Sequence, residues 1–96
     1  MVFVNMNTSR PVSVDIHVLF FAKCRELSQT TRSVFTVPSE IRASDLLDKI
    51  VIQFGLTTIR HNLIIAHNES FVENLNDSIF LKDGDELAVI PPLSGG

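Results

Sequence analysis

The sequence has neither tryptophan nor tyrosine, and its 96 residues include a single cysteine, Cys24. One cysteine cannot form an internal disulfide, so nothing in the sequence indicates an oxidising compartment. A lone cysteine can be a nucleophile, but no histidine stands at a supporting spacing. We therefore expect Cys24 to be a small apolar residue near the core.

Charge and long apolar runs are also scarce. Eight basic and eleven acidic residues give a net charge of -3, with no basic stripe for nucleic-acid binding. No apolar run approaches the roughly 18 residues that span a membrane, and the N-terminus lacks the pattern of a secretory signal. A chain of this length forms one domain, and these absences predict a cytosolic one without nucleic-acid or membrane partners.

Motifs for metal binding and for common catalysis are missing as well. His17, His61 and His67 are too scattered for a metal site, and neither CxxC nor HExxH occurs. The sequence has no G-x-G-x-x-G, P-loop or G-x-S-x-G. His17 falls on the polar side of a strand, so we expect it to face solvent, with a partner contact as the alternative. The sequence predicts no metal site and no tightly bound cofactor.

The hydrophobic pattern predicts an α+β fold. Residues 1–11 are expected to form a flexible leader, and alternating apolar residues predict a strand over Val12–Phe21. Leu19 and Phe21 make both sides of its end apolar, which is typical of a central strand covered on its second side. A short helix over Ala22–Leu27 should follow. Later strands are expected at Ser33–Val37, Leu63–Ala66, Ser70–Val72, around Ile79 and Leu81, and at Leu87–Ile90.

The clearest element is a helix over Ala43–Phe54, whose apolar residues recur at the 3.6-residue period. Gly55 is its natural C-terminal cap, while Ser39 and Ser44 are equal candidates for the N-cap. One main helix on a mixed sheet of about five strands predicts a β-grasp, the ubiquitin architecture, over residues 12–90. This fold requires the first and last strands to pair in parallel.

Residues 91–96 should form an extended tail. Pro91 and Pro92 lack N–H groups and cannot continue a strand or helix, and six residues at about 3.3 Å each reach roughly 20 Å. Gly95 and Gly96 have no side chains to obstruct a narrow channel. ATP can activate a terminal glycine carboxylate as an acyl adenylate, and entry of sulfur then yields a thiocarboxylate. A frayed, inert end is the alternative.

The acidic residues Asp83, Asp85 and Glu86 cluster around the turn at Gly84. They form either a solvated turn or a docking patch for a basic partner, and the sequence leaves both interpretations open.

Two motifs together carry a family resemblance. Leu19-Phe20-Phe21-Ala22-Lys23 precedes Arg25-Glu26-Leu27, and Asp83-Gly84-Asp85-Glu86-Leu87-Ala88 leads to Pro91-Pro92-Leu93-Ser94-Gly95-Gly96. Residues 12–96 thereby resemble the small, sulfur-carrying subunit of molybdopterin synthase, a family of ubiquitin-like β-grasp proteins. Residues 1–11 lie outside the resemblance.

The resemblance implies a function for the tail. An adenylating sulfurtransferase of the ubiquitin-activating type would use ATP to charge Gly96 and then convert it to a thiocarboxylate. The tail would insert into the large catalytic subunit, in a heterotetramer of two small and two large subunits. Sulfur would convert cyclic pyranopterin monophosphate to molybdopterin, and the small subunit would not be an enzyme on its own. The inserted tail would consist of Pro91, Pro92, Leu93, Ser94, Gly95 and Gly96.

Three other functions fit a β-grasp ending in Gly-Gly. One is a sulfur carrier for thiazole synthesis or tRNA thiolation, although these carriers generally lack the Pro-Pro. The others are a ubiquitin-like protein modifier and an interaction domain with an inert tail.

Overall fold

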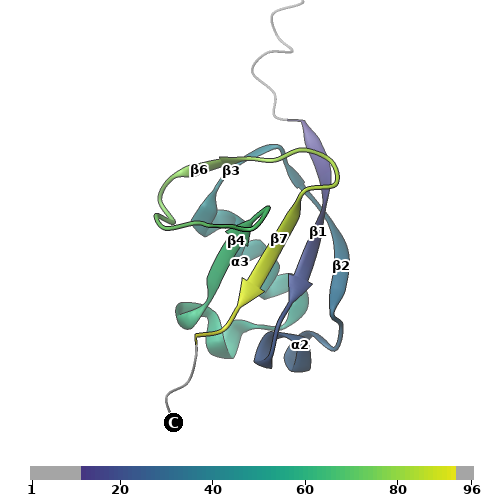
Figure 1. Ribbon diagram of the computed structural model, residues 1–96, viewed down its shortest axis with the longest axis vertical. Helices are drawn as coiled ribbons and strands as arrows, with labels where there is room; N and C mark the ends of the chain where they lie inside the picture. The colour runs from purple at the N-terminus through teal and green to yellow at the C-terminus, as the bar shows by residue number, and fades with distance from the viewer. Residues whose placement is uncertain (1–11, 93–96) are drawn as a thin grey trace, which may run out of the picture.

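The computed structural model describes residues 12–92 (Figure 1). The leader, residues 1–11, and tail residues 93–96 lie outside the described residues. The elements are β1 (Ser13–Phe20), α2 (Lys23–Ser28), β2 (Arg32–Pro38), β3 (Glu40–Arg42), α3 (Ala43–Phe54), η1 (Thr57–Asn62), β4 (Ile64–His67), β5 (Ser70–Phe71), β6 (Ser78–Phe80) and β7 (Glu86–Ile90).

The main sheet has five strands in the order β2-β1-β7-β4-β5. β1 and β7 pair in parallel, and every other pairing in this sheet is antiparallel. Figure 1 shows these two strands side by side, with α3 on one side of the sheet. This arrangement confirms the predicted β-grasp and its parallel central pair. The sequence pattern did not predict η1 or the separate two-stranded sheet that β3 forms with β6.

The main helix has the predicted bounds, but its N-terminus is capped differently from either expectation. Neither Ser39 nor Ser44 caps it, since Arg42 is the N-cap residue and makes no side-chain capping bond. Instead, the loop before β6 supplies backbone acceptors: the Ala43 N–H donates to the Asp77 carbonyl at 2.9 Å. The Ser44 N–H donates to the Leu75 carbonyl at 2.8 Å. Two of the unpaired N–H groups at the helix start are thereby satisfied by tertiary structure.

Gly55 ends α3 as predicted, in the left-handed conformation with φ 76°. The helix buries its apolar stripe against the inner face of the sheet, where alternate residues of β1 point. The shared core includes Ile16, Val18, Phe20, Leu46, Leu47 and Ile50, each at most 2% exposed. Full burial of one such side chain contributes about 1.5–3 kcal/mol, so this interface accounts for much of the fold's stability.

A strained turn joins β1 to α2. The Cys24 N–H donates to the Phe21 carbonyl at 3.0 Å, and the first central residue, Ala22, has φ 51° and ψ -123°. These angles belong to a type II′ turn, whose first central position favours glycine. A Cβ there costs conformational energy, so the turn holds Phe21 in place at the expense of some strain.

Replacing Ala22 with glycine should therefore stabilise the protein. We expect Ala22→Gly to raise the free energy of unfolding by about 1 kcal/mol, because relief of the strained φ exceeds the entropic cost of glycine. Urea denaturation measures this value. Lys23→Gly, one residue on and inside α2, is the matched control and should be destabilising. A destabilised Ala22→Gly variant would contradict the strain.

Candidate functional site

The last described strand, β7, is the central strand of the main sheet, so its C-terminal end lies in the middle of one end of the sheet. β7 lies between β1 and β4, with Ile64 opposite Ile90 and the Phe21 N–H donating to the Val89 carbonyl at 3.3 Å. Beyond Ile90 the chain continues through Pro91, which is half-buried, and Pro92, which is exposed. The predicted tail residues Leu93, Ser94, Gly95 and Gly96 lie outside the described residues, so their predicted insertion into a partner stays a prediction.

The sheet face opposite α3 carries apolar side chains next to this chain end. Strand register places Leu19, Ala88 and Ala66 in one row across β1, β7 and β4. Phe21 and Ile64 flank that row and are 45% and 41% exposed. We call this surface, which consists of Leu19, Phe21, Ile64, Ala66, Ala88 and Ile90, the open face.

The open face is hollowed where its small residues meet. The hollow is lined by Leu19, Phe21, Ala66 and Ala88, with Glu69 and Glu86 on its polar side. Alanine on two adjacent strands leaves room that a larger side chain would fill. A contiguous exposed apolar surface of this kind is typical of a protein–protein interface.

Leu19 and Phe21 were expected to be covered on this side of the strand. The expectation of a central strand is confirmed, because β1 pairs with both β2 and β7. The prediction that this second side is covered is wrong for the described residues. The only helices described, α2, α3 and η1, leave Phe21 exposed. The two-sided apolar pattern was therefore the signal of an apolar face that the described residues leave exposed at Phe21.

The three acidic candidates each have a separate partner within the domain. The Asp83 carboxylate accepts the Asp15 N–H at 2.8 Å, which ties the turn to β1. Glu86 pairs with Arg32 at 3.7 Å across the open face. Asp85 accepts a hydrogen bond from the His67 ring at 2.8 Å. These contacts give the cluster a structural role in the turn, and its role in docking stays a prediction.

Asp85 and His67 form a hydrogen-bonded pair whose side chains are only 15% and 23% exposed. The hydrogen bond from His67 lowers the pKa of Asp85 to about 2, opposed by partial burial and assisted by the Lys82 N–H at 3.0 Å. The carboxylate is consequently ionised at neutral pH. The pair joins the end of β4 to the turn that leads into β7.

The other chemical candidates do not form a reactive site. Cys24 is fully buried, as expected, and burial raises the pKa of its thiol, which disfavours the nucleophilic thiolate. His17 is half-buried instead of solvent-facing, and its Nδ1 is inaccessible and has no hydrogen-bond partner in the described chain. His61 is exposed in η1.

Residues 12–92, the part of the chain that the structure describes, offer neither a metal-ligand cluster nor a membrane-spanning helix. They hold no group of three or more His, Cys, Asp or Glu side chains placed to bind a metal ion. None of their helices is long and apolar enough to cross a membrane.

Comparison with known proteins assigns this chain to a family. The model of the ThiS family matches residues 18–96. The chain belongs to the ThiS family. It is 65% identical over 91 residues to the molybdopterin synthase sulfur carrier subunit of Drosophila simulans, covering 95% of this chain and 100% of that one. The protein of the same name from Anopheles gambiae is 50% identical over 86 residues, with 88% and 94% covered.

One solved structure with a similar chain is a complex of two proteins. This ThiS-family chain is similar to a chain in the complex of subunits 1 and 2 of molybdopterin-converting factor from Helicobacter pylori, with 28% identity and a TM-score of 0.56. The match covers 86% of this chain and 100% of that one. By homology the chain groups with the molybdopterin synthase sulfur carrier subunits, as its two motifs predicted.

The depressed pKa of Asp85 makes stability depend on pH. A carboxylate with a lowered folded-state pKa stabilises the fold above its unfolded pKa of 3.8 and loses this contribution as pH falls toward 2. Asp85→Asn should therefore cost about 1–2 kcal/mol at pH 7, after allowance for solvent screening, and less near pH 2. Urea denaturation of both proteins across this range measures the difference.

A double-mutant cycle supplies the control. In a His67→Ala background, Asp85→Asn should cost less at pH 7, because the principal partner of the carboxylate is gone. An equal cost in both backgrounds would assign the pKa shift to another group.

Proposed function

We propose that this chain carries sulfur on the carboxylate of Gly96 for molybdopterin synthesis in the cytosol. The observation that carries the proposal is the position of β7: this central strand ends beside the open face, and the chain leaves it there through Pro91 and Pro92. A partner that binds this face would receive the tail at the same time. The relatives at 65% and 50% identity support sulfur transfer to a pterin as the purpose of this arrangement.

The chemistry needs an exposed acyl group and no other reactive side chain from this chain. The Gly96 carboxylate attacks the α-phosphate of ATP, pyrophosphate leaves, and an acyl adenylate forms. Sulfide supplied by the activating enzyme then attacks the acyl carbon and displaces AMP, and the terminus becomes a thiocarboxylate. Two charged copies of the chain, in turn, each transfer one sulfur to cyclic pyranopterin monophosphate within the large subunit, and these two sulfurs build the dithiolene. Catalytic groups come from the partners, so this chain acts as a non-catalytic sulfur donor.

Two kinds of partner follow from this scheme. One is an ATP-dependent adenylyltransferase and sulfurtransferase of the ubiquitin-activating type. The other is the large catalytic subunit, in a heterotetramer of two small and two large chains. The Helicobacter pylori complex of subunits 1 and 2, which contains a chain similar to this one, supports the second partner.

The tail glycines should be needed for steric reasons. An extended backbone must pass a narrow entrance to reach ATP, and Gly95→Val adds a branched side chain and restricts φ at that point. We expect the variant to unfold at the same temperature as the wild type but to lose adenylation and molybdopterin formation. ATP–pyrophosphate exchange and a molybdopterin assay measure the two steps.

Gln53→Val, on the exposed side of α3, is the matched control for the added side chain and should remain active. Deletion of Gly96 should abolish both steps without unfolding the domain. Wild-type rates for Gly95→Val would remove the steric basis of the proposal.

The open face should supply affinity for the large subunit. Phe21→Ser removes an aromatic side chain beside the end of β7, and loss of one such contact should weaken binding by roughly tenfold or more. Ile52→Ser is the matched control, because Ile52 is 75% exposed but lies on α3, away from the open face. Isothermal titration calorimetry gives both dissociation constants. Equal losses for the two variants would indicate that the open face has no special role in docking.

A further inference from the structure

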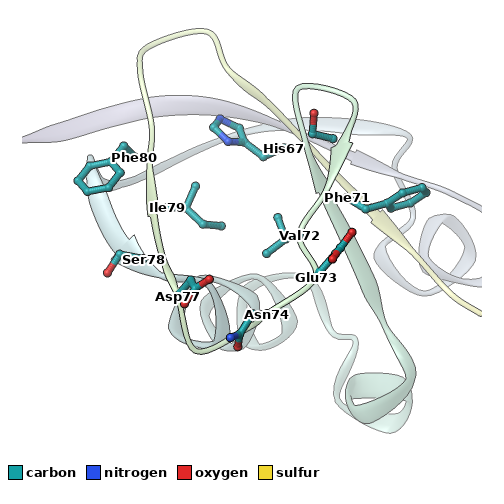
Figure 2. A pocket seen from close by; sticks show the side chains of 10 residues that line it. His67, Phe71, Val72, Glu73, Asn74, Asp77, Ser78, Ile79 and Phe80 are labelled. Carbon is teal, nitrogen blue, oxygen red and sulfur yellow. The ribbon is translucent and has the colours of Figure 1, made fainter.

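A second groove lies at the side of the domain, between β5 and β6. Figure 2 shows Val72 and Ile79 pointing into it from its two walls. Ile79 belongs to the core and is 7% exposed, so the floor of the groove is apolar. Phe71 and Phe80 stand on opposite rims and are 66% and 68% exposed. We call this hollow the β5–β6 groove; its relevant residues are Phe71, Val72, Glu73, Asp77, Ile79 and Phe80.

The backbone of β5 has an unpaired side that borders the groove. His67 and Ser70 flank the two-residue hairpin turn, and the Val72 N–H donates to the Ile65 carbonyl at 3.0 Å. Paired and unpaired residues alternate along an antiparallel ladder. The N–H and C=O of Phe71, between these two positions, therefore point away from β4. β5 is the last strand of its sheet, so this edge is free to accept another strand within the described structure.

The opposite wall of the groove, formed by β6, also has backbone groups that are not paired with a neighbouring strand. The Asp77 carbonyl accepts the Ala43 N–H, and the Leu81 N–H donates to the Ser39 carbonyl at 2.7 Å. By the same alternation, the backbone groups of Ser78 and Phe80 point away from β3. Two strand edges with available donors and acceptors thus border one apolar hollow.

The charge of the groove restricts what can occupy it. Glu73 and Asp77 line it, and neither carboxylate takes part in a salt bridge of the described residues. The histidine at its upper end, His67, is already bonded to Asp85. No lysine or arginine lines the hollow. Its electrostatic complement is a basic segment.

We propose that the β5–β6 groove binds an extended, basic segment of a partner protein, which adds to β5 as a sixth strand. An apolar side chain of that segment fills the hollow over Val72 and Ile79, between the two phenylalanine rims. Lysine or arginine side chains face Glu73 and Asp77. Backbone pairing gives affinity in this mode, and the pocket and charges give selectivity. The site is independent of the sulfur on Gly96, so it holds whether or not the proposed function is correct.

The groove also borders the open face. Phe71 lies opposite Ala66 in the β4–β5 ladder, and Ala66 lines the hollow of the open face. A partner seated on the open face can therefore extend one segment past Phe71, around the β5 edge, into the groove.

A peptide titration of the full-length, 15N-labelled protein tests the proposal. The probe is acetyl-Lys-Ile-Thr-Val-Arg-amide, and its charge-reversed analogue carries Glu at both basic positions. We expect the basic peptide to shift the amide resonances of Phe71, Val72 and Ser78–Phe80, and the acidic peptide to bind roughly tenfold more weakly or not at all. A fully N-methylated basic peptide, which lacks backbone donors, should lose binding. Shifts located elsewhere, or equal binding of the N-methylated peptide, would overturn strand addition.

Charge-exchange variants give a second, independent measurement. Glu73→Lys/Asp77→Lys should reverse the preference, so that the acidic peptide binds better than the basic one. Glu26→Lys/Asp48→Lys makes the same change in net charge outside the groove and should keep the original preference. Both double variants are checked for folding by their amide spectra. Sedimentation of the unliganded protein completes the test, because a dimer that Phe80→Ala dissociates would assign the groove to a second copy of this chain instead.

Discussion

The parallel pairing of β1 with β7 is the constraint on which the rest of the structure depends. It joins the first and last strands of the described chain, so the domain closes only when nearly the whole sequence has folded. Because β7 then lies between β1 and β4, its end is held on both sides. A chain that leaves such a strand starts from a rigid, defined point. The same pairing brings Leu19 beside Ala88, which creates the open face next to that point.

The two faces of this sheet differ in the size of their side chains. The inner face is filled by branched and aromatic residues that pack on α3, with Phe54 meeting Phe20 at 4.8 Å between ring centroids. On the outer face, Ala66 and Ala88 form a hollow between larger neighbours. Burial of the outer apolar residues against a partner would stabilise the complex through the hydrophobic effect, which these residues do not contribute in the isolated domain. The sheet is thus stabilised from one side and available for binding on the other.

Local patterns in the sequence predicted the elements that local physics determines. The bounds of α3 and its Gly55 cap were correct because helical periodicity and a left-handed glycine are encoded within a few residues. The capping of α3 by the Asp77 and Leu75 carbonyls was missed because those residues lie more than thirty positions along the chain. The Asp83 bond to the Asp15 N–H spans 68 positions and was equally beyond a local pattern.

The candidate site divides in the same way. The tail motif is contiguous, so the sequence alone indicated it, whereas the open face is assembled from three strands by their register. Leu19 and Phe21 carried a partial signal, since their apolar character on the second side of β1 required a cover. The sequence could not say that the described elements, within residues 12–92, leave Phe21 exposed. The β5–β6 groove gave even less signal, because its two walls are joined only by the loop that caps α3.

The proposed carrier role, in which two partners bind the chain in turn, would impose one more requirement on these surfaces. Both partners must take the same terminal glycines, so the tail by itself cannot tell them apart. Discrimination is a difference in binding free energy and has to come from contacts that one partner makes and the other lacks. The open face lies beside the end of β7 and, under this proposal, would be available to either partner. The β5–β6 groove lies around the β5 edge and bears charge of one sign, so it can be engaged by one partner without obstructing the tail for the other. Because Phe71 lies opposite Ala66 of the open face and also lines the β5–β6 groove, the two surfaces adjoin, and under this proposal one small domain could offer the same tail to both partners and still distinguish them.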